Sequence, residues 1–545
     1  MAEEQRANAE VSLIHDLRAI LNYYKKDQHI VPLKRAELLR QKLALVQPDI
    51  AIKHINLVRV EGRNILHEAA SLGDLQVFDC VLQPFSQAQR IKLLGSTNNS
   101  PSKYHQKSKS LCEEYIPLHF AILFNQTDIF KTAVGLITDH AALYELLSFS
   151  DSSQNTCLHW ASIRGHVQIH KICTQTLPTE TMERLLMMEN CSGQTSLQVA
   201  VVENQTEVLN EIINLLPSTL LMEILNREDY AKRNAFHYLA KRPCTKDSFK
   251  ALHEKLKIFE VSEVLVSVDA PNKRNPLHYA ASSGNLTFIQ HFLPLTHCDD
   301  LPSNLKCALE QKDHHGRNPL AVAIIHCHTE IAKAIINPLH TDLLKLLLSS
   351  ADIAGGNAFH HIAKHCKVVD LLETIHDRFE MLDVMEAMMQ VDITRSRNAL
   401  HYAAFYGNSD FVRHLLPLSS FHVFSHKLLA AVSQLFEKKD VYGRTPLAVA
   451  CLTNQSEVIE MFLRLTLITG AVQHLYEADG KDQTPISLSH NKDLAGLLYR
   501  YGAVTIFFKK WLVGLTRMGI RQLSIPFDIL STGMVELYLQ QSKFS

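Results

Sequence analysis

A seven-residue element recurs along the chain about every 40 residues, and this recurrence constrains the fold more than any other feature. The copies are NILHEAA at Asn64, IPLHFAI at Ile116, TCLHWAS at Thr156, TSLQVAV at Thr195, NAFHYLA at Asn234, NPLHYAA at Asn275, NPLAVAI at Asn318, NAFHHIA at Asn357, NALHYAA at Asn398, TPLAVAC at Thr445 and TPISLSH at Thr484. Most successive copies lie 39 to 43 residues apart, with longer steps of 52 and 47. Self-similarity at a fixed period indicates stacked structural repeats.

A longer period overlies the short one. The histidines of the third, sixth and ninth copies, His159, His278 and His401, are 119 and 123 residues apart. The middle members of three blocks carry a second mark, which is NQT at Asn125 and Asn204 and NQS at Asn454. The sequence therefore indicates duplication of a three-repeat block, with the first block lacking its third member.

Each copy has the pattern of a turn followed by two helices. Asn or Thr before the apolar run can cap a helix by accepting a backbone N–H. Leu400, Ala403 and Ala404 form a narrow apolar face, and Gly407 is suited to end the first helix. The second helix is predicted from apolar residues at helical spacing: Phe411, Val412, Leu415 and Leu416. One such pair cannot bury its own apolar faces, whereas stacked pairs can.

These elements, G-x-T-P-L-H-x-A-A-x-x-G-N/H followed by V-x-x-L-L, resemble ankyrin repeats over roughly residues 61–503. The resemblance implies an all-α, elongated ankyrin-like solenoid of about eleven repeats. It also implies that the repeat histidine hydrogen-bonds backbone near the turn and ties neighbouring repeats together. Seven residues match that histidine position: His67, His119, His159, His237, His278, His360 and His401.

The repeats are longer than the usual ankyrin unit of about 33 residues. The surplus reads as a short third helix before the next turn, so many units are expected to be three-helical with a shortened finger. Five segments carry this signal: TMERLLMME at Thr181, TLLMEIL at Thr219, TDLLKLLL at Thr341, VMEAMMQ at Val384 and HKLLAAVSQLF at His426.

Two ends lie outside the array, which is assigned to residues 59–503. Residues 1–58 are predicted to form an N-terminal helical cap with helices near residues 12–25 and 33–46. Residues 504–545 are predicted to form a C-terminal helical cap or tail. The tail combines aromatic and basic residues, among them Phe507, Trp511 and Lys510, so an interfacial helix on a membrane surface is the alternative.

Composition limits the classes of function. The 55 basic and 56 acidic residues give a formal charge of −1, which does not favour nucleic-acid or anionic-membrane binding. The 11 cysteines are scattered singly, as is typical of reduced thiols in the cytosol. Neither a signal-peptide apolar core nor a run of about 18 apolar residues is present, so a membrane span is not expected.

The sequence does not predict an enzyme, a cofactor or a metal centre. No GxSxG, HExxH, Walker or kinase motif occurs, and the two ends are too short for an ordinary catalytic domain. A cluster of His and Cys residues lacks the spacing of a zinc site, so we interpret it as chance: His326, Cys327, His328, His360, His361, His365 and Cys366, with His314 and His315 nearby. Cys157 stands where the family places proline, so we interpret it as a packing residue.

One candidate binding feature is a column of arginines. Arg precedes the Asn or Thr of the turn in six repeats: Arg63, Arg233, Arg274, Arg317, Arg397 and Arg444. Stacking in register would align them along one edge, where guanidinium groups could bind carboxylates or phosphates. The alternative is that they are solvated residues common at this repeat position.

A second candidate is aromatic. Phe405 and Tyr406 occupy variable positions that face the concave groove in the ankyrin family, and the sister block has Ser282 and Ser283 there. Large aromatics are therefore not required for folding at these positions. Tyr442 and Arg444 belong to the next turn and are expected nearby, while Arg164 and Phe124 occupy similar positions in earlier units. Tyr and Arg are frequent in interface hot spots; the alternative is packing against the third helices.

Together these patterns predict a non-enzymatic, monomeric scaffold that binds a protein partner along its concave face. Long ankyrin arrays with repeats near 40 residues are similar to effectors that intracellular bacteria secrete into host cells. That resemblance implies a host protein as partner and the host cytosol as the site of action. The alternatives are a membrane-surface adaptor that uses residues 504–545 and, less favoured, an enzyme with a site in the groove.

Overall fold

The computed structural model describes residues 2–25, 33–98, 114–242, 251–252, 254–256, 262–293, 301–365, 370–415, 426–469, 475–489, 496 and 498. The chain divides into two compact units, Met1–Pro271 and Asn272–Ser545, here called unit 1 and unit 2. Both are stacks of short helices, and no β-strand occurs among the described residues. The all-α repeat fold predicted from the sequence is confirmed.

Unit 1 contains α1 (Ala2–Tyr24), α2 (Leu33–Leu45), α3 (Pro48–Leu57), α4 (Ile65–Leu72), α5 (Leu75–Leu82), α6 (Gln87–Leu94), α7 (Pro117–Leu123), α8 (Thr127–Gly135), α9 (His140–Ser148), α10 (Cys157–Arg164), α11 (Val167–Thr176), α12 (Thr179–Leu186), α13 (Ser196–Val202), α14 (Thr206–Leu215), α15 (Ser218–Asn226) and α16 (Ala235–Lys241).

Unit 2 contains α19 (Pro276–Ser283), α20 (Leu286–Phe292), α21 (Ser303–Glu310), α22 (Pro319–Ile325), α23 (Thr329–Ile336), α24 (Thr341–Ser349), α25 (Ala358–Lys364), α26 (Asp370–His376), α27 (Met381–Met389), α28 (Ala399–Tyr406), α29 (Ser409–Leu415), α30 (His426–Glu437), α31 (Pro446–Leu452), α32 (Ser456–Thr469) and α33 (Pro485–Leu488).

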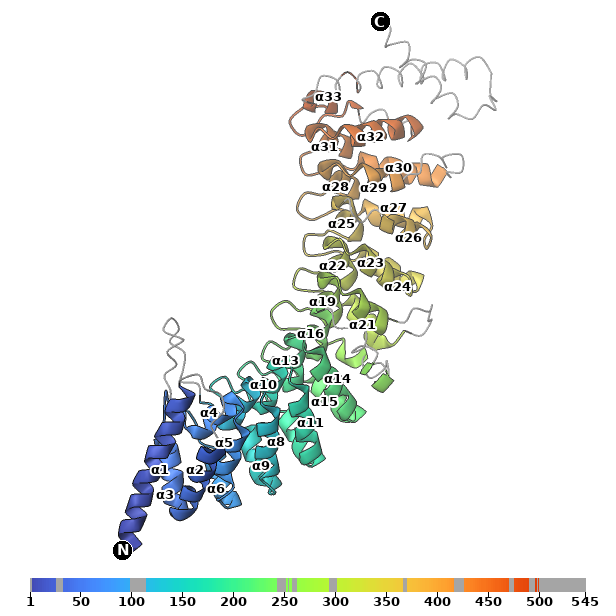
Figure 1. Cartoon of the computed structure of the whole chain (residues 1–545). Helices are drawn as coiled ribbons and strands as arrows, with labels where there is room; N and C mark the ends of the chain where they lie inside the picture. Colours follow the sequence, from blue (N-terminus) through green and yellow to red (C-terminus); the bar gives the residue numbers. More distant parts are fainter. Residues whose placement is uncertain are drawn as a thin grey trace, which may run out of the picture. The chain divides into compact units, whose positions relative to one another are not determined.

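Within each unit, helices of the same rank in successive repeats lie side by side (Figure 1). In unit 2 the first helices form the row α19, α22, α25, α28 and α31, and the second helices form the row α20, α23, α26, α29 and α32. Leu400, Ala404 and Phe411 are at most 1% exposed, so the apolar faces read from the sequence do form the core.

The third helices predicted from the surplus length are present. α12, α15, α24, α27 and α30 coincide with the five predicted segments, and α6, α9 and α21 are further third helices. The turn that remains before each repeat is short, as in residues 440–444. The extended finger of the ankyrin family is therefore shortened here, as expected.

The repeat histidine links neighbouring repeats as the resemblance implied. Nδ1 of His401 accepts the backbone N–H of Asn398 at 3.3 Å, and Nε2 lies 3.0 Å from the carbonyl oxygen of Arg444 in the next turn. Equivalent contacts to the next turn are made by His159, His278 and His360. In the fourth repeat Gln198 replaces the histidine, and its Nε2 donates to the carbonyl of Arg227 at 2.7 Å.

The structure also explains the NQT and NQS marks of the three-repeat block. α28 ends at Gly407, which has a positive φ of 72°, and a Cβ added there would lie 2.3 Å from Oε1 of Gln455. Gly165 meets Gln205 in the same way. The NQT and NQS marks therefore provide a left-handed Asn that ends the middle repeat's first helix, and a Gln that lies against the preceding glycine.

At the N-terminus the structure has three helices where the sequence predicted two. α1 and α2 correspond to the predicted pair, and α3 follows them in the sequence before the first repeat. α1 packs on α4, and the hydroxyl of Tyr24 donates to Asp74 at 3.0 Å. The cap assignment of residues 1–58 stays a prediction, as do the array limits of 59 and 503.

Candidate partner-binding surface

Most turns are organised by an aspartate that is buried in seven of them, and in the turn before the fourth repeat Asn190 takes this role. One carboxylate oxygen of Asp440 accepts the backbone N–H of Tyr442 at 2.9 Å and that of Arg444 at 3.0 Å. The N–H of Asp440 in turn donates to the carbonyl of Arg444 at 2.9 Å. Because the aspartate satisfies the backbone from inside, the intervening Val441 and Tyr442 are left facing solvent, 56% and 50% exposed.

Successive turns are joined by single backbone hydrogen bonds. The N–H of Ile393 donates to the carbonyl of Ala354 at 2.8 Å, and the N–H of Val441 donates to Arg395 at 2.9 Å. The N–H of Gly480 continues the series to Tyr442 at 2.8 Å. These bonds hold the turns of unit 2 in register, so residues at equivalent turn positions lie in a row.

Two of the predicted aromatic residues, Phe405 and Tyr406, meet in unit 2, and the third, Tyr442, belongs to the turn whose Asp440 binds Arg397 beside Phe405. Phe405 and Tyr406, at the end of α28, are 37% and 43% exposed, and their rings meet edge to face with centroids 5.1 Å apart. The Tyr406 ring also stacks on Tyr402 at 6.4 Å and lies 5.6 Å from Nζ of Lys364 on α25. We call Phe405, Tyr406 and Tyr442 the aromatic patch.

The guanidinium groups of two arginines lie against the rings of Phe405 and Tyr442. The guanidinium of Arg397 is 5.3 Å from the Phe405 centroid and donates to Asp440 from Nε at 3.2 Å and Nη2 at 3.1 Å. Arg444 repeats the arrangement one turn later, 5.2 Å from the Tyr442 centroid and 3.1 Å from Asp479. The rings of Phe405 and Tyr442 therefore each lie against a cation that a carboxylate of the next turn holds in place.

The other predicted arginines also meet carboxylates of the protein itself. Arg317 donates to Asp313 at 2.9 Å, and Arg274 reaches the same carboxylate at 3.5 Å. Burial raises the pKa of Asp313, but hydrogen bonds from Arg317 outweigh it and hold that pKa below its usual value.

In unit 1, Arg233 pairs with Asp269 at 3.8 Å, and Arg63 pairs with Glu68 at 3.7 Å. Recognition of a partner's anion by this column would compete with these internal ion pairs.

The last two predicted residues lie in unit 1. Phe124 follows α7, is 51% exposed and stacks on Phe120 with centroids 6.5 Å apart. Arg164 is the exposed last residue of α10. The structure thus places them in a separate unit from the aromatic patch.

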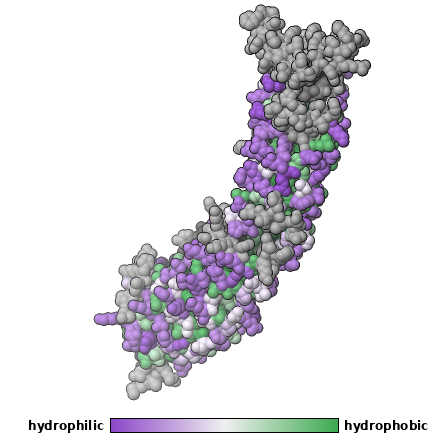
Figure 2. All heavy atoms as spheres, turned by 90° about the vertical axis from the view of Figure 1, so that its right-hand side faces the viewer, coloured by the Kyte–Doolittle hydropathy of each residue, from purple (hydrophilic) through white to green (hydrophobic). Residues whose placement is uncertain are grey.

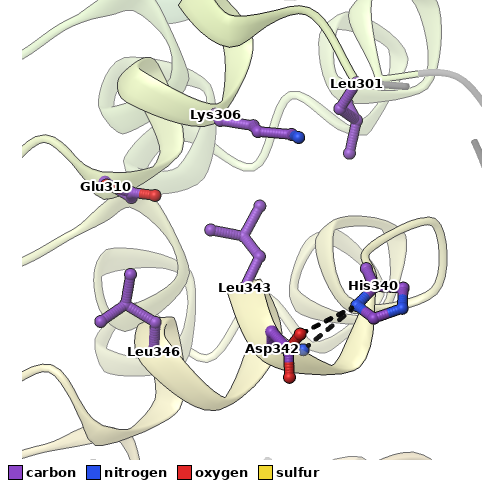
Figure 3. A pocket seen from close by; sticks show the side chains of 7 residues that line it. All are labelled: Leu301, Lys306, Glu310, His340, Asp342, Leu343 and Leu346. Atoms are coloured by element: carbon purple, nitrogen blue, oxygen red, sulfur yellow. Dashed lines mark hydrogen bonds and ion pairs between the residues drawn. The ribbon is translucent and has the colours of Figure 1, made fainter. Parts of the chain in front are cut away.

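The sequence reading missed an open cavity of about 490 Å³ between third helices of unit 2. Figure 3 shows Lys306 of α21 and Leu343 of α24 pointing into it from opposite sides. Its remaining lining residues are Leu301, Glu310, His340, Asp342 and Leu346. No motif signals this cavity, because its residues come from two third helices that meet only after stacking.

The buried thiols of unit 1 do not form a nucleophilic site. Burial raises the pKa of Cys173 to about 12, and burial together with the neighbouring Cys173 raises the pKa of Cys157. Both thiols therefore stay protonated at neutral pH, and the thiolate is the reactive form. Among the residues that the structure describes, no group of three or more His, Cys, Asp or Glu side chains is arranged to hold a metal ion.

The face that carries the third helices is largely hydrophilic where it is coloured, with small separate apolar areas (Figure 2). Within the described ranges, no helix has both the length and the apolar character required to cross a bilayer. The predicted membrane-surface helix, residues 504–545, lies outside the described residues.

Comparison with known protein families identifies the type of repeat. A family model described as ankyrin repeats (3 copies) matches residues 222–341 and 378–471. Ankyrin repeats are present in this chain. Ankyrin repeats generally mediate protein–protein interaction, which agrees with a scaffold. The second matched stretch includes α28 and the turn at 440–444, and therefore the whole aromatic patch. No curated protein matches the sequence.

Proposed function

We propose that the protein is a non-enzymatic scaffold that binds a partner protein, and that the aromatic patch is the centre of its binding surface. The observation that carries the proposal is the support of exposed rings by fixed cations. Phe405 rests on Arg397 and Tyr442 rests on Arg444, while both rings remain more than a third exposed. An aromatic surface held in place before binding loses little conformational entropy on association.

The chemistry around the patch favours a partner with apolar and carbonyl groups. The patch offers three large ring surfaces, and the ammonium of Lys364 lies beside Tyr406. The nearby carboxylates Asp392 and Asp440 already have partners within the protein. Asp392 accepts a hydrogen bond from the hydroxyl of Tyr402 at 2.7 Å, and Asp440 binds Arg397. The surface that meets a partner is therefore aromatic with a cationic border.

Replacing the two patch rings by Phe405→Ala/Tyr406→Ala is expected to weaken partner binding about 10- to 100-fold, because central aromatics contribute about 2 kcal/mol or more to hot spots. The measurement is quantitative affinity capture from cell lysate with the full chain as bait. Tyr230→Ala, which removes a 70% exposed tyrosine of unit 1, is the matched control. Equal recovery with the double variant and the parent would reject the patch.

We also propose, on the repeat length near 40 residues, that the protein acts as a secreted bacterial effector on a host protein, as a monomer in the host cytosol. The likeness to long ankyrin effectors is the support for this part. A translocation reporter fused to the full chain is expected to signal inside infected host cells, and not in a secretion-deficient strain. Equal signals from both strains would contradict secretion.

A further inference from the structure

Three consecutive turns of unit 2 expose a β-branched apolar residue at the same position, directly after the turn aspartate. Ile353 is 67% exposed, Ile393 is 75% exposed and Val441 is 56% exposed. We call these three residues the tip row. Other turns have Ser152, His314 or Gly480 at this position, so folding does not require an apolar side chain there. Three neighbouring exposed aliphatic residues that the fold does not need indicate a surface selected for contact.

The tip row is rigid because its backbone is bonded from turn to turn. The N–H of Ile353 donates to the carbonyl of His315 at 2.9 Å, and the N–H groups of Ile393 and Val441 continue the series. The glycines of the preceding turns allow the close approach. A Cβ added to Gly355 would lie 2.7 Å from the backbone nitrogen of Ile393, and one added to Gly316 would lie 2.8 Å from that of Ile353.

The spacing of the row selects the secondary structure of its partner. Stacked helices are about 10 Å apart, so equivalent turn residues recur at about 10 Å. Residues seven apart on an α-helix are separated by about 10.5 Å on nearly the same face. Residues on one face of a strand are separated by about 7 or 13 Å, which fits neither step. A helix that runs along the turns can therefore meet all three tips.

The charge around the tip row determines which charged residues a partner helix should carry on its polar face. Arg395, in the same turn as Ile393, is exposed, and no carboxylate of the described chain lies within ion-pair distance of it. The aspartates of these turns point inward and accept backbone N–H groups, as Asp392 does from Arg395 and Asp440 from Tyr442. The tips are thus apolar, and among their described residues the one exposed charged side chain, Arg395, complements an acidic residue on the partner.

We propose that the tip row binds an acidic amphipathic helix of the partner protein, with apolar side chains of that helix at i, i+7 and i+14. The inference rests on the proposed protein-binding function and specifies the partner's recognition element. The row adjoins the aromatic patch through Tyr442, which follows Val441 in the same turn. One helix can therefore contact the tips while a neighbouring part of the partner covers the rings.

The test uses a display library of random 24-residue peptides selected against the full chain. Selected peptides are expected to carry apolar residues at seven-residue intervals with Asp or Glu between them. Their affinity is expected to fall at least tenfold for Ile353→Ser/Ile393→Ser/Val441→Ser. The matched control is Tyr230→Ser, which changes the same turn position in unit 1 and is expected to leave affinity unchanged. Circular dichroism and the melting temperature establish that both variants fold.

Three outcomes would overturn the inference: no selected peptide, selected peptides with apolar residues at every second position, or equal binding to the triple variant. The patch variant Phe405→Ala/Tyr406→Ala separates this result from the proposed function. If partner capture is lost with the patch variant but kept with the triple tip variant, the scaffold function stands and the helix inference fails.

Discussion

Unit 2 is expected to lose about 6 kcal/mol of its free energy of unfolding between pH 7.5 and pH 5. Burial lowers the pKa of His278, His360 and His401 to about 4, against about 6.5 in an unfolded chain. The unfolded state therefore binds more protons in this interval, so the free energy of unfolding falls as the pH drops from 6.5 toward 4. Each histidine contributes a loss of about 2 kcal/mol at pH 5.

Three such losses together approach the total stability of an ordinary domain, about 5–15 kcal/mol. Thermal unfolding followed by circular dichroism at pH 7.5, 6.5, 5.5 and 5.0 measures the effect. Asp313 and Asp352 do not contribute in this interval, because hydrogen bonds hold their pKa values below the usual carboxyl range. Their contribution is lost only at lower pH.

The chain itself supplies the control. Gln198 occupies the histidine position in the fourth repeat, accepts the N–H of Thr195 at 2.8 Å and donates to Arg227 at 2.7 Å. His278→Gln/His401→Gln should therefore keep both bonds, remove two of the three repeat histidines of unit 2 and reduce the acid loss that comes from them by about two thirds. A melting temperature that is constant from pH 7.5 to 5.0 in the parent would refute the assignment.

Removal of the Asp440 carboxylate is expected to lower the free energy of unfolding of unit 2 by about 3–5 kcal/mol. Asp440 is 4% exposed and Arg397 is 5% exposed, so Asp440→Ala leaves a buried guanidinium without its partner. It also leaves the N–H groups of Tyr442 and Arg444 without their acceptor. Urea unfolding measures the change.

An exposed ion pair of the same unit is the matched control. Asp410 and Arg413 lie 2.7 Å apart, but both side chains are more than half exposed. Asp410→Ala is expected to change the free energy of unfolding by no more than about 1 kcal/mol. Equal losses from Asp440→Ala and Asp410→Ala would show that the buried pair contributes nothing beyond an ordinary surface contact. The double variant Arg397→Ala/Asp440→Ala is expected to recover part of the loss.

The sequence predicted the helices well because local signals repeat. The Asn398 cap, the Leu400–Ala403–Ala404 face and the Gly407 terminator all favour the same helix, α28. α3 was missed because it lacks the repeat motif. Its signal was Pro48, a residue suited to the first turn of a helix, followed by the buried residues Ala51, Ile52 and Ile55.

The candidate site was predictable only in part. The placement of Tyr442 one turn after Phe405 and Tyr406 followed from the repeat pattern, but the acceptors of the arginines did not. Arg397 pairs with Asp440, 43 residues later, and this choice depends on the side-chain geometry of two adjoining turns. The tip row could not be predicted either. Ile353 and Ile393 are residue types that usually lie in the core, and only the backbone conformation of the turn directs their side chains to solvent.

The contact between the glycine that ends one repeat's first helix and the Gln side chain of the next repeat limits how such a chain can change in length during evolution. Where a repeat's first helix ends in a left-handed glycine, the absence of a Cβ leaves room for a Gln or His side chain of the next repeat, as it does for Gln455 at Gly407 and for His328 at Gly284. Loss of a single repeat would place a first helix that ends in glycine before a repeat that lacks the matching Gln or His side chain. Loss or gain of three units at once restores every junction, so gene variants of this architecture should differ by about 120 codons, the spacing between His278 and His401 being 123 residues.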